Sequence, residues 1–185
     1  SAFSRFLQNI DRPTVGLLNV GEEDQKGFDY LRAAAETLRR DDLPVNYVGF
    51  VEGSDFSSGT VDVIVTDGFT GNIALKTAEG VAQLVRAFLR RAFAANIFTK
   101  IAYLFARPAL SRVRSMINPN AYNGAVFLGL NGISVKSHGG TNAFGYANAI
   151  GVAADMVKNG YLPEVSQAIA KANFILNEEK RDENG

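Results

Sequence analysis

Val61-Asp62-Val63-Ile64-Val65-Thr66-Asp67-Gly68-Phe69-Thr70-Gly71-Asn72 combines two patterns in one short stretch. Its first half is an apolar run rich in β-branched side chains, which favours a strand in the centre of a sheet. Its second half carries an acid and two glycines, and a helical pattern begins near Ile73. The stretch therefore predicts a buried strand, a loop and a long helix, in that order.

Two further extended apolar runs precede this stretch, at residues 14–20 and 45–51, and the sequence between them predicts a helix over 24–39. Strands that alternate with helices indicate an α/β protein with a mostly parallel sheet flanked by helices. The 185 residues are 46% hydrophobic and 21% charged, as in globular proteins that bury a core. We therefore expect residues 1–185 to form one α/β unit.

After Gly80 the apolar residues recur with a helical period, and Asn96 separates two such stretches. The pattern predicts a protruding amphipathic helical arm over about 81–116, which Pro108 ends or kinks. Such an arm covers its apolar face with the sheet, a second subunit or a lipid interface.

Asn131-Gly132, between apolar runs at 125–130 and 133–136, favours a two-residue hairpin turn. Thr141 is a candidate cap for a helix over 142–159, and a last helix is expected over 163–177.

Acidic and basic residues balance at 19 each, but residues 80–154 contain eight Lys and Arg and no Asp or Glu. This segregation indicates either an anionic partner or a solvated helical face. Nucleic acid is not expected, because the aromatic residues of this segment lie on the apolar stripe. The sequence also lacks an apolar run of about 18 residues, so no membrane-spanning helix is expected.

Several kinds of catalytic and metal site are excluded by composition. The chain has no Cys, which excludes disulfides, thiolate metal ligands and a cysteine nucleophile. With one His and no paired-His motif, neither a transition-metal site nor a classical serine triad is expected. We expect no metal and no cofactor.

Glycine-containing loops next to expected strands and helices are the candidate sites. Such loops let the backbone approach a ligand closely, and a helix N-terminus that follows one can hold an anion. Each also has a plain structural interpretation as a turn, with Asp67 fixing backbone or with acids favouring a helix dipole. The segments are 19–23 with Lys26, 67–72, 122–125 and 136–141.

These motifs together resemble the bacterial phosphate acyltransferase family called PlsX. The resemblance covers Pro13 to about Lys171. The matching strings are Val15 to Glu23 with Lys26-Gly27, Gly49 to Gly53, Val61 to Asn72 with Leu75-Lys76-Thr77 and Glu79-Gly80, Tyr122 to Ala125, Leu128-Gly129 to Gly132, and Ser137-His138-Gly139.

The resemblance implies that inorganic phosphate attacks the thioester of a fatty acyl chain on acyl-carrier protein, giving acyl phosphate for phospholipid synthesis. It also implies a fold similar to isocitrate and isopropylmalate dehydrogenases, a homodimer, and a cytoplasmic enzyme in peripheral contact with the anionic inner membrane of a bacterium. The positively charged helical arm over about 81–116 would then have two uses, contact with the anionic membrane and docking of the acidic carrier protein.

The reaction that the resemblance implies suggests roles for residues at the matching positions and for the neighbouring Lys136. Asn72 and Lys76 would bind phosphate or the thioester oxyanion, Lys136 and His138 would donate from the far side, and Asp67 would position these groups. The expected substrate-binding residues are Asn19, Glu22, Lys26, Gly68, Gly71, Asn123, Gly124 and Gly139.

Members of the family are about twice this length, so the chain is expected to be a C-terminal half. Three alternatives stay open. One is a non-catalytic dimerisation and membrane-docking module, and another is a short-chain phosphate acyltransferase on a related fold. A dehydrogenase on the same fold is disfavoured, because neither a carboxylate cluster for a metal nor a nicotinamide fingerprint is present.

Overall fold

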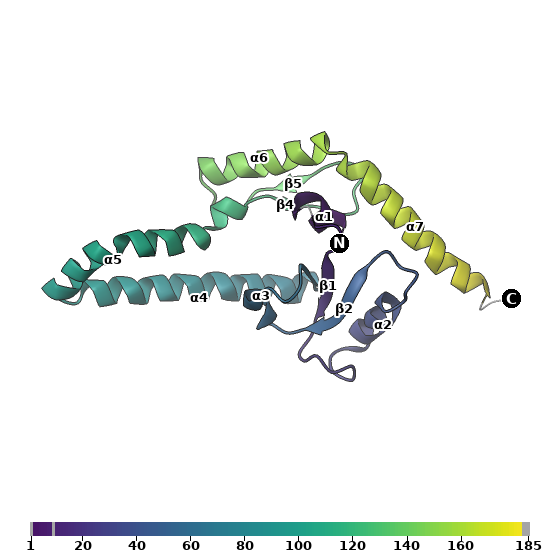
Figure 1. The fold of residues 1–185 in the computed structure, drawn as a ribbon, viewed down its shortest axis with the longest axis horizontal. Coiled ribbons are helices and arrows are strands. Elements are labelled where there is room, and N and C mark those ends of the chain that lie inside the picture. Colours follow the sequence, from purple (N-terminus) through teal and green to yellow (C-terminus); the bar gives the residue numbers. More distant parts are fainter. Residues whose placement is uncertain (1, 9, 183–185) are drawn as a thin grey trace. The chain divides into compact units, whose positions relative to one another are not determined.

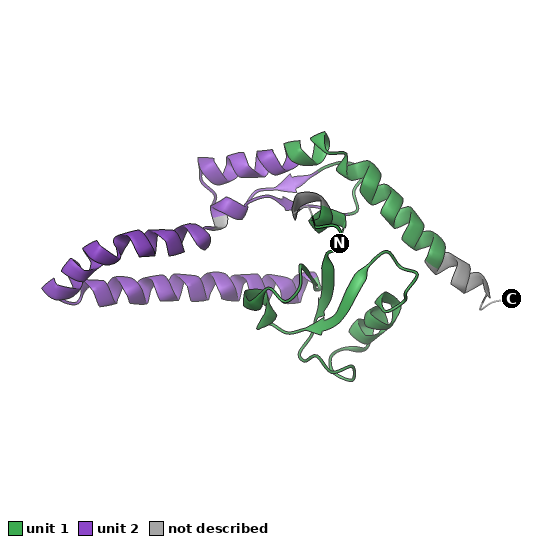
Figure 2. Cartoon of the chain, viewed as in Figure 1, with its two compact units in different colours: residues 1–67, 129–133, 154–185 green, residues 68–128, 134–153 purple. Residues whose placement is uncertain are grey.

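A computed structural model describes residues 2–8 and 10–182, which divide into two compact units (Figures 1 and 2). Unit 1 consists of Ser1–Asp67, Gly129–Ile133 and Ala154–Gly185, and unit 2 of Gly68–Leu128 and Ser134–Ala153.

Unit 1 contains a three-stranded parallel sheet in the order β2-β1-β3. The strands are β1 (Thr14–Leu18), β2 (Asn46–Val51) and β3 (Val63–Val65). Helix α2 (Asp29–Leu38) contributes Ala35 to a core with Leu17 and Phe50. The predicted α/β architecture, a parallel sheet with flanking helices, is confirmed.

The prediction that residues 61–66 form a central strand is wrong. In the sheet formed by the described residues, β1 is central and β3 lies at the edge. Leu17 of β1 is 4% exposed, whereas Val65 of β3 is 43% exposed. A run of β-branched residues predicts a strand but does not fix its place in the sheet.

Helix α2 begins at Asp29 rather than at the predicted residue 24. Gly27 has a φ of 83°, which is outside the right-handed helical region. The preceding residues therefore form a loop between β1 and α2. A short helix, α3 (Asp55–Ser58), follows β2.

In unit 1, helix α1 (Ala2–Gln8) contacts the beginning of helix α7 (Tyr161–Asp182). The rings of Phe3 and Tyr161 pack edge to face with centroids 6.0 Å apart. Arg5 forms an ion pair with Glu164. Helix α7 begins at Tyr161, two residues before the start predicted for the last helix.

Unit 2 contains two long helices, α4 (Gly68–Ala94) and α5 (Ile97–Met116), which pack against each other (Figure 1). The predicted break at Asn96 is confirmed. Its side chain accepts a hydrogen bond from the Thr99 backbone N–H, and the Thr99 hydroxyl accepts one from the Asn96 N–H. This capping box starts α5.

Two predictions about these helices are wrong. Helix α4 begins at Gly68, so most of the predicted loop over residues 67–72 is helical. Of the two outcomes predicted for Pro108, an end of the helix is the wrong one, because α5 continues to Met116. A proline removes one backbone donor, and the helical hydrogen bonds on either side can continue.

Both helices carry large exposed apolar side chains, among them Phe88 at 57% and Leu104 at 65% exposure. No helix within residues 2–8 and 10–182 is long and apolar enough to cross a membrane.

The rest of unit 2 comprises the 3-10 helix η1 (Pro119–Tyr122), strands β4 (Ala125–Val126) and β5 (Val135–Lys136), and the first part of α6 (Ala143–Lys158). The strands pair antiparallel, as a hairpin requires, with Ala125 opposite Lys136. The predicted two-residue turn at Asn131-Gly132 is wrong. Phe127 N–H donates to Ser134 O at 2.9 Å, so residues 128–133 form a longer loop.

Asn142, rather than Thr141, supplies the side-chain bond at the start of α6. Its Oδ1 accepts from the Gly145 backbone N–H at 3.0 Å. The Thr141 hydroxyl donates instead to Asn120 Oδ1 at 2.9 Å. Thr141 therefore ties the helix start to η1.

Candidate functional site

Helix α4 presents Asn72, Lys76 and Glu79 at a spacing of four and three residues, which places them on one helix face. Lys76 Nζ lies 2.7 Å from Glu79 Oε2. This hydrogen bond is the largest cause that lowers the pKa of Glu79, so the carboxylate is ionised near neutral pH. The face therefore carries an amide, an ammonium and a carboxylate.

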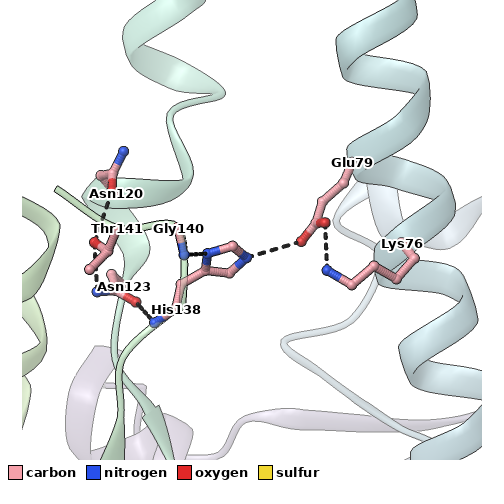
Figure 3. A network of polar contacts seen from close by, with 7 residues as sticks. All are labelled: Lys76, Glu79, Asn120, Asn123, His138, Gly140 and Thr141. Carbon is pink, nitrogen blue, oxygen red and sulfur yellow. Dashed lines mark hydrogen bonds and ion pairs between the residues drawn. The ribbon is translucent and has the colours of Figure 1, made fainter.

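His138 faces the same carboxylate from the loop between β5 and α6 (Figure 3). Its Nε2 lies 3.6 Å from Glu79 Oε1. Its Nδ1 accepts a hydrogen bond from the Gly140 backbone N–H at 3.1 Å. Because Nδ1 is an acceptor, the proton of the neutral ring is on Nε2, which points toward Glu79.

A buried amide, Asn123, fixes the backbone of this loop. It is 6% exposed, and its Oδ1 accepts from the His138 N–H at 2.8 Å. Its Nδ2 donates to Ser137 Oγ and to Gly145 O, both at 2.8 Å. A buried amide with its donors and acceptor paired is a rigid support. The position of the His138 backbone is therefore set from inside the unit.

Asn120 adds a second amide contact between η1 and α6. Its backbone carbonyl accepts from Asn148 Nδ2 at 2.8 Å, and its side chain accepts the Thr141 hydroxyl bond. At Gly145 a Cβ would lie 2.3 Å from Thr141 Oγ1. A side chain at this position would therefore force the two amide-bearing segments apart.

Unit 1 contains a separate polar cluster after β1. Asn19 is 8% exposed, its Nδ2 donates to Lys26 O at 3.1 Å, and its Oδ1 accepts from the Val20 N–H at 2.9 Å. Lys26 Nζ lies 2.8 Å from Glu23 Oε1. This contact raises the pKa of Lys26 and lowers that of Glu23. Asn19 therefore shapes the loop, and Lys26 has a carboxylate beside it.

The structure brings some of the predicted site residues together. In unit 2, Lys76 and His138 meet at Glu79, Asn123 supports the histidine, and Asn72 shares the α4 face. The other predicted residues lie near these segments or in unit 1. Gly139 and Gly124 follow His138 and Asn123 in the chain, Lys136 is exposed on β5, Asp67, Gly68 and Gly71 lie at the start of α4, and Asn19, Glu22 and Lys26 lie in the loop after β1.

The sequence predicted no site role for Glu79 or Asn120, and it predicted Thr141 as a helix cap rather than as a partner of Asn120. Glu79 had a detectable signal, because it follows Lys76 by three residues in a predicted helix and is the last acid before Asp155. Asn120 had none, since the contacts that join it to Thr141 and Asn148 bridge more than twenty positions along the chain.

Chemically, this arrangement suits an anion. An ammonium and an imidazole N–H converge on one carboxylate, and an anionic ligand can use the same two donors. Among residues 2–8 and 10–182, no group of three or more His, Cys, Asp or Glu could hold a metal ion.

Comparison with known proteins identifies the family. Residues 1–163 match the family described as fatty acid synthesis protein. The phosphate acyltransferase of Paramagnetospirillum magneticum is 57% identical over 159 residues, which are 86% of this chain and 45% of the relative. Those of Rhodospirillum rubrum and Rhodospirillum centenum are 50% and 54% identical, over 94% and 95% of this chain and 50% of each relative.

The chain spans about half the length of the curated relatives that it matches. The match nevertheless runs through both units and includes Lys76, Asn123 and His138. The chain belongs to the fatty acid synthesis protein family, the PlsX-type phosphate acyltransferases that its motifs resemble.

Proposed function

We propose that the chain is part of an enzyme that transfers a long-chain fatty acyl group from acyl-carrier protein to inorganic phosphate. The product, acyl phosphate, would serve phospholipid synthesis. The observation that carries this proposal is the convergence of Lys76 and His138 on one carboxylate (Figure 3). The names of the relatives supply the reaction class.

The reaction needs no protein nucleophile. A phosphate oxygen attacks the thioester carbonyl carbon, the carbon–sulfur bond breaks, and the carrier thiolate leaves and takes up a proton. The protein must hold phosphate, orient it and stabilise the oxyanion that forms on the thioester. In the proposal Lys76 and Asn72 bind the phosphate or the oxyanion, and the His138 Nε2–H donates to the same groups.

The remaining predicted residues have supporting roles in the proposal. Lys136, two residues before His138, adds a positive charge, and Asp67 positions the start of α4. Gly68 and Gly71 lie in the first turn of α4, whose backbone N–H groups favour an anion. Further substrate contacts are assigned to Asn19, Glu22, Lys26, Asn123, Gly124 and Gly139.

We further propose that the chain forms a single α/β unit with an isocitrate dehydrogenase-like fold and assembles as a homodimer. In this dimer α4 from Val81 onward and α5 form a protruding helical arm. Exposed apolar side chains on both helices support a partner-covered face. The arginines of the same helices would dock the acidic carrier protein or rest on the anionic inner membrane, as for a cytoplasmic, peripherally bound enzyme.

The test is phosphate-dependent release of free carrier protein from palmitoyl-acyl-carrier protein, with acyl phosphate trapped by hydroxylamine. It is run on the 185-residue chain and on the chain extended to the family's full length. We expect turnover by the longer protein, reduced about 100-fold or more by Lys76→Ala and by Asn72→Ala.

Lys158→Ala and Asn131→Ala are the matched controls, because both residues are exposed and lie outside the proposed site. We expect them to keep wild-type turnover. Absence of turnover in both lengths would contradict the proposal and favour a docking module. Turnover with acetyl thioesters alone would favour a short-chain phosphate acyltransferase.

A further inference from the structure

Glu79 is the single acidic residue in the sequence of unit 2, which is otherwise positively charged. The basic residues of this unit are Lys76, Arg86, Arg90, Arg91, Lys100, Arg107, Arg112, Arg114 and Lys136. In such a unit a carboxylate is favourable next to many of these side chains. Of these basic residues it contacts Lys76, and its second neighbour is the only histidine of the chain.

The carboxylate uses a different oxygen for each neighbour (Figure 3). Oε2 accepts from Lys76 Nζ at 2.7 Å, and Oε1 lies 3.6 Å from His138 Nε2. Two cationic or donor groups from separate segments, α4 and the loop before α6, are thereby held on either side of one small anionic group.

The backbone and the opposite ring nitrogen of His138 are already fixed. Asn123 holds the His138 N–H, and the Gly140 N–H holds Nδ1. The His138 side chain is nevertheless 52% exposed, so burial does not restrict rotation of the ring. Of the described contacts of its side chain, Glu79 provides the one at Nε2.

We propose that Glu79 is a positioning residue, which holds the Lys76 ammonium and the His138 Nε2–H so that one phosphate meets both donors. The inference rests on the proposed function. The carboxylate does not react and takes no proton from the substrate. It sets where two phosphate-binding groups are found, and phosphate enters beside it.

The test follows phosphate binding directly in the 185-residue chain. Because the chain has a single histidine, its ring Cε1–H signal in NMR belongs to His138. We expect phosphate to move this signal in the wild type. Glu79→Gln and Glu79→Ala should each raise the half-saturating phosphate concentration about tenfold, and Glu79→Asp should retain most of the affinity.

The Lys76–Glu79 contact is an exposed helix pair, which contributes little to stability, so we expect the variants to fold. A backbone amide spectrum checks this for each variant. Glu36→Gln, exposed on α2, is the matched control and should bind phosphate like the wild type. In the full-length protein the Glu79 variants should raise KM for phosphate more than they lower kcat.

Equal phosphate affinity in the wild type and in both Glu79→Gln and Glu79→Ala would overturn the inference and leave the proposed function intact. Tighter binding by Glu79→Gln would also overturn it, because the carboxylate would then repel phosphate rather than place its donors. No phosphate response of the wild-type histidine, together with no turnover, would remove the proposed function and this inference with it.

Discussion

Gly27 excludes a side chain for two separate reasons. Its φ of 83° lies in the left-handed region, and a Cβ there would lie 2.1 Å from Asn19 Oδ1. Gly59 also has a positive φ, 66°, but a Cβ would meet nothing within 4 Å. A substitution at Gly59 therefore measures backbone strain alone, whereas one at Gly27 measures backbone strain together with steric overlap.

We expect Gly59→Ala to lower the free energy of unfolding by about 1 kcal/mol, the cost of the backbone conformation alone. Gly27→Ala should lower it by about 3 kcal/mol, because the overlap with Asn19 adds to that cost. Urea denaturation followed by circular dichroism measures both. Equal losses would show that the Asn19 loop moves aside freely.

Asp62 connects β1 to the segment before β3. Its Oδ2 accepts hydrogen bonds from the Thr14 hydroxyl at 2.7 Å and the Thr14 backbone N–H at 2.8 Å. The hydroxyl bond, followed by the backbone bond, lowers the pKa of Asp62. A lowered folded-state pKa contributes stability that is present above the unfolded value and lost as pH falls through the folded one.

We therefore expect the wild type to lose part of its stability below about pH 4 through Asp62, and Asp62→Asn to show a shallower loss over that range. Urea midpoints measured between about pH 2 and about pH 6 test this. Asp41→Asn, an exposed aspartate between α2 and β2, is the control. If the urea midpoints of Asp62→Asn and the wild type fall equally as the pH is lowered, Asp62 does not contribute this stability.

At the level of elements, the apolar face of α4 and α5 gives a prediction about assembly. Phe88 is 57% exposed, and covering the exposed part of the ring contributes about 1–2 kcal/mol per copy. We expect Phe88→Glu to weaken dimerisation in sedimentation equilibrium and to reduce flotation with anionic vesicles, while phosphate binding is unchanged.

Gln83→Glu is the matched control, because it places the same charge at an exposed polar position of the same helix. It should sediment and float like the wild type. If the two variants behave alike, the exposed ring has no part in assembly, and the dimer proposed for this face is wrong.

The three strands of unit 1 and the longer helices could be predicted from the sequence because each has a local signal, whereas α1, α3 and η1 were not predicted. Thr14–Leu18 is a short apolar run, and Asn96 is a good capping residue. The start of α4 could not, since Gly68 and Gly71 favour a loop locally yet are helical here. The central position of β1 depends on pairing with two strands that are distant in sequence.

The candidate site shows the same division. Lys76 and His138 were predicted from motifs, whereas their meeting at Glu79 depends on how α4 and the loop before α6 pack. The role of Asn123 in holding the His138 N–H likewise bridges fifteen positions along the chain. Residue types can be read from a sequence, but distances between separate segments cannot.

At the scale of the whole molecule, unit 1 is assembled from three separate stretches of chain, whereas Gly68–Leu128 is continuous (Figure 2). Helix α1 meets α7 through Phe3 with Tyr161 and through Arg5 with Glu164, across a separation of 159 positions in the second case. These contacts join the first described helix of unit 1 to the beginning of its last helix.

The contact between α1 and α7 has a consequence for biosynthesis. A ribosome releases the chain from the N-terminus, so α1 and the strands leave the exit tunnel long before the helix that contacts α1. The α4–α5 hairpin needs only neighbouring sequence and can form while translation continues. Unit 1 cannot be completed until Tyr161 has been synthesised, and a transcript that stops short of that codon yields a protein in which α1 lacks its contacts with α7.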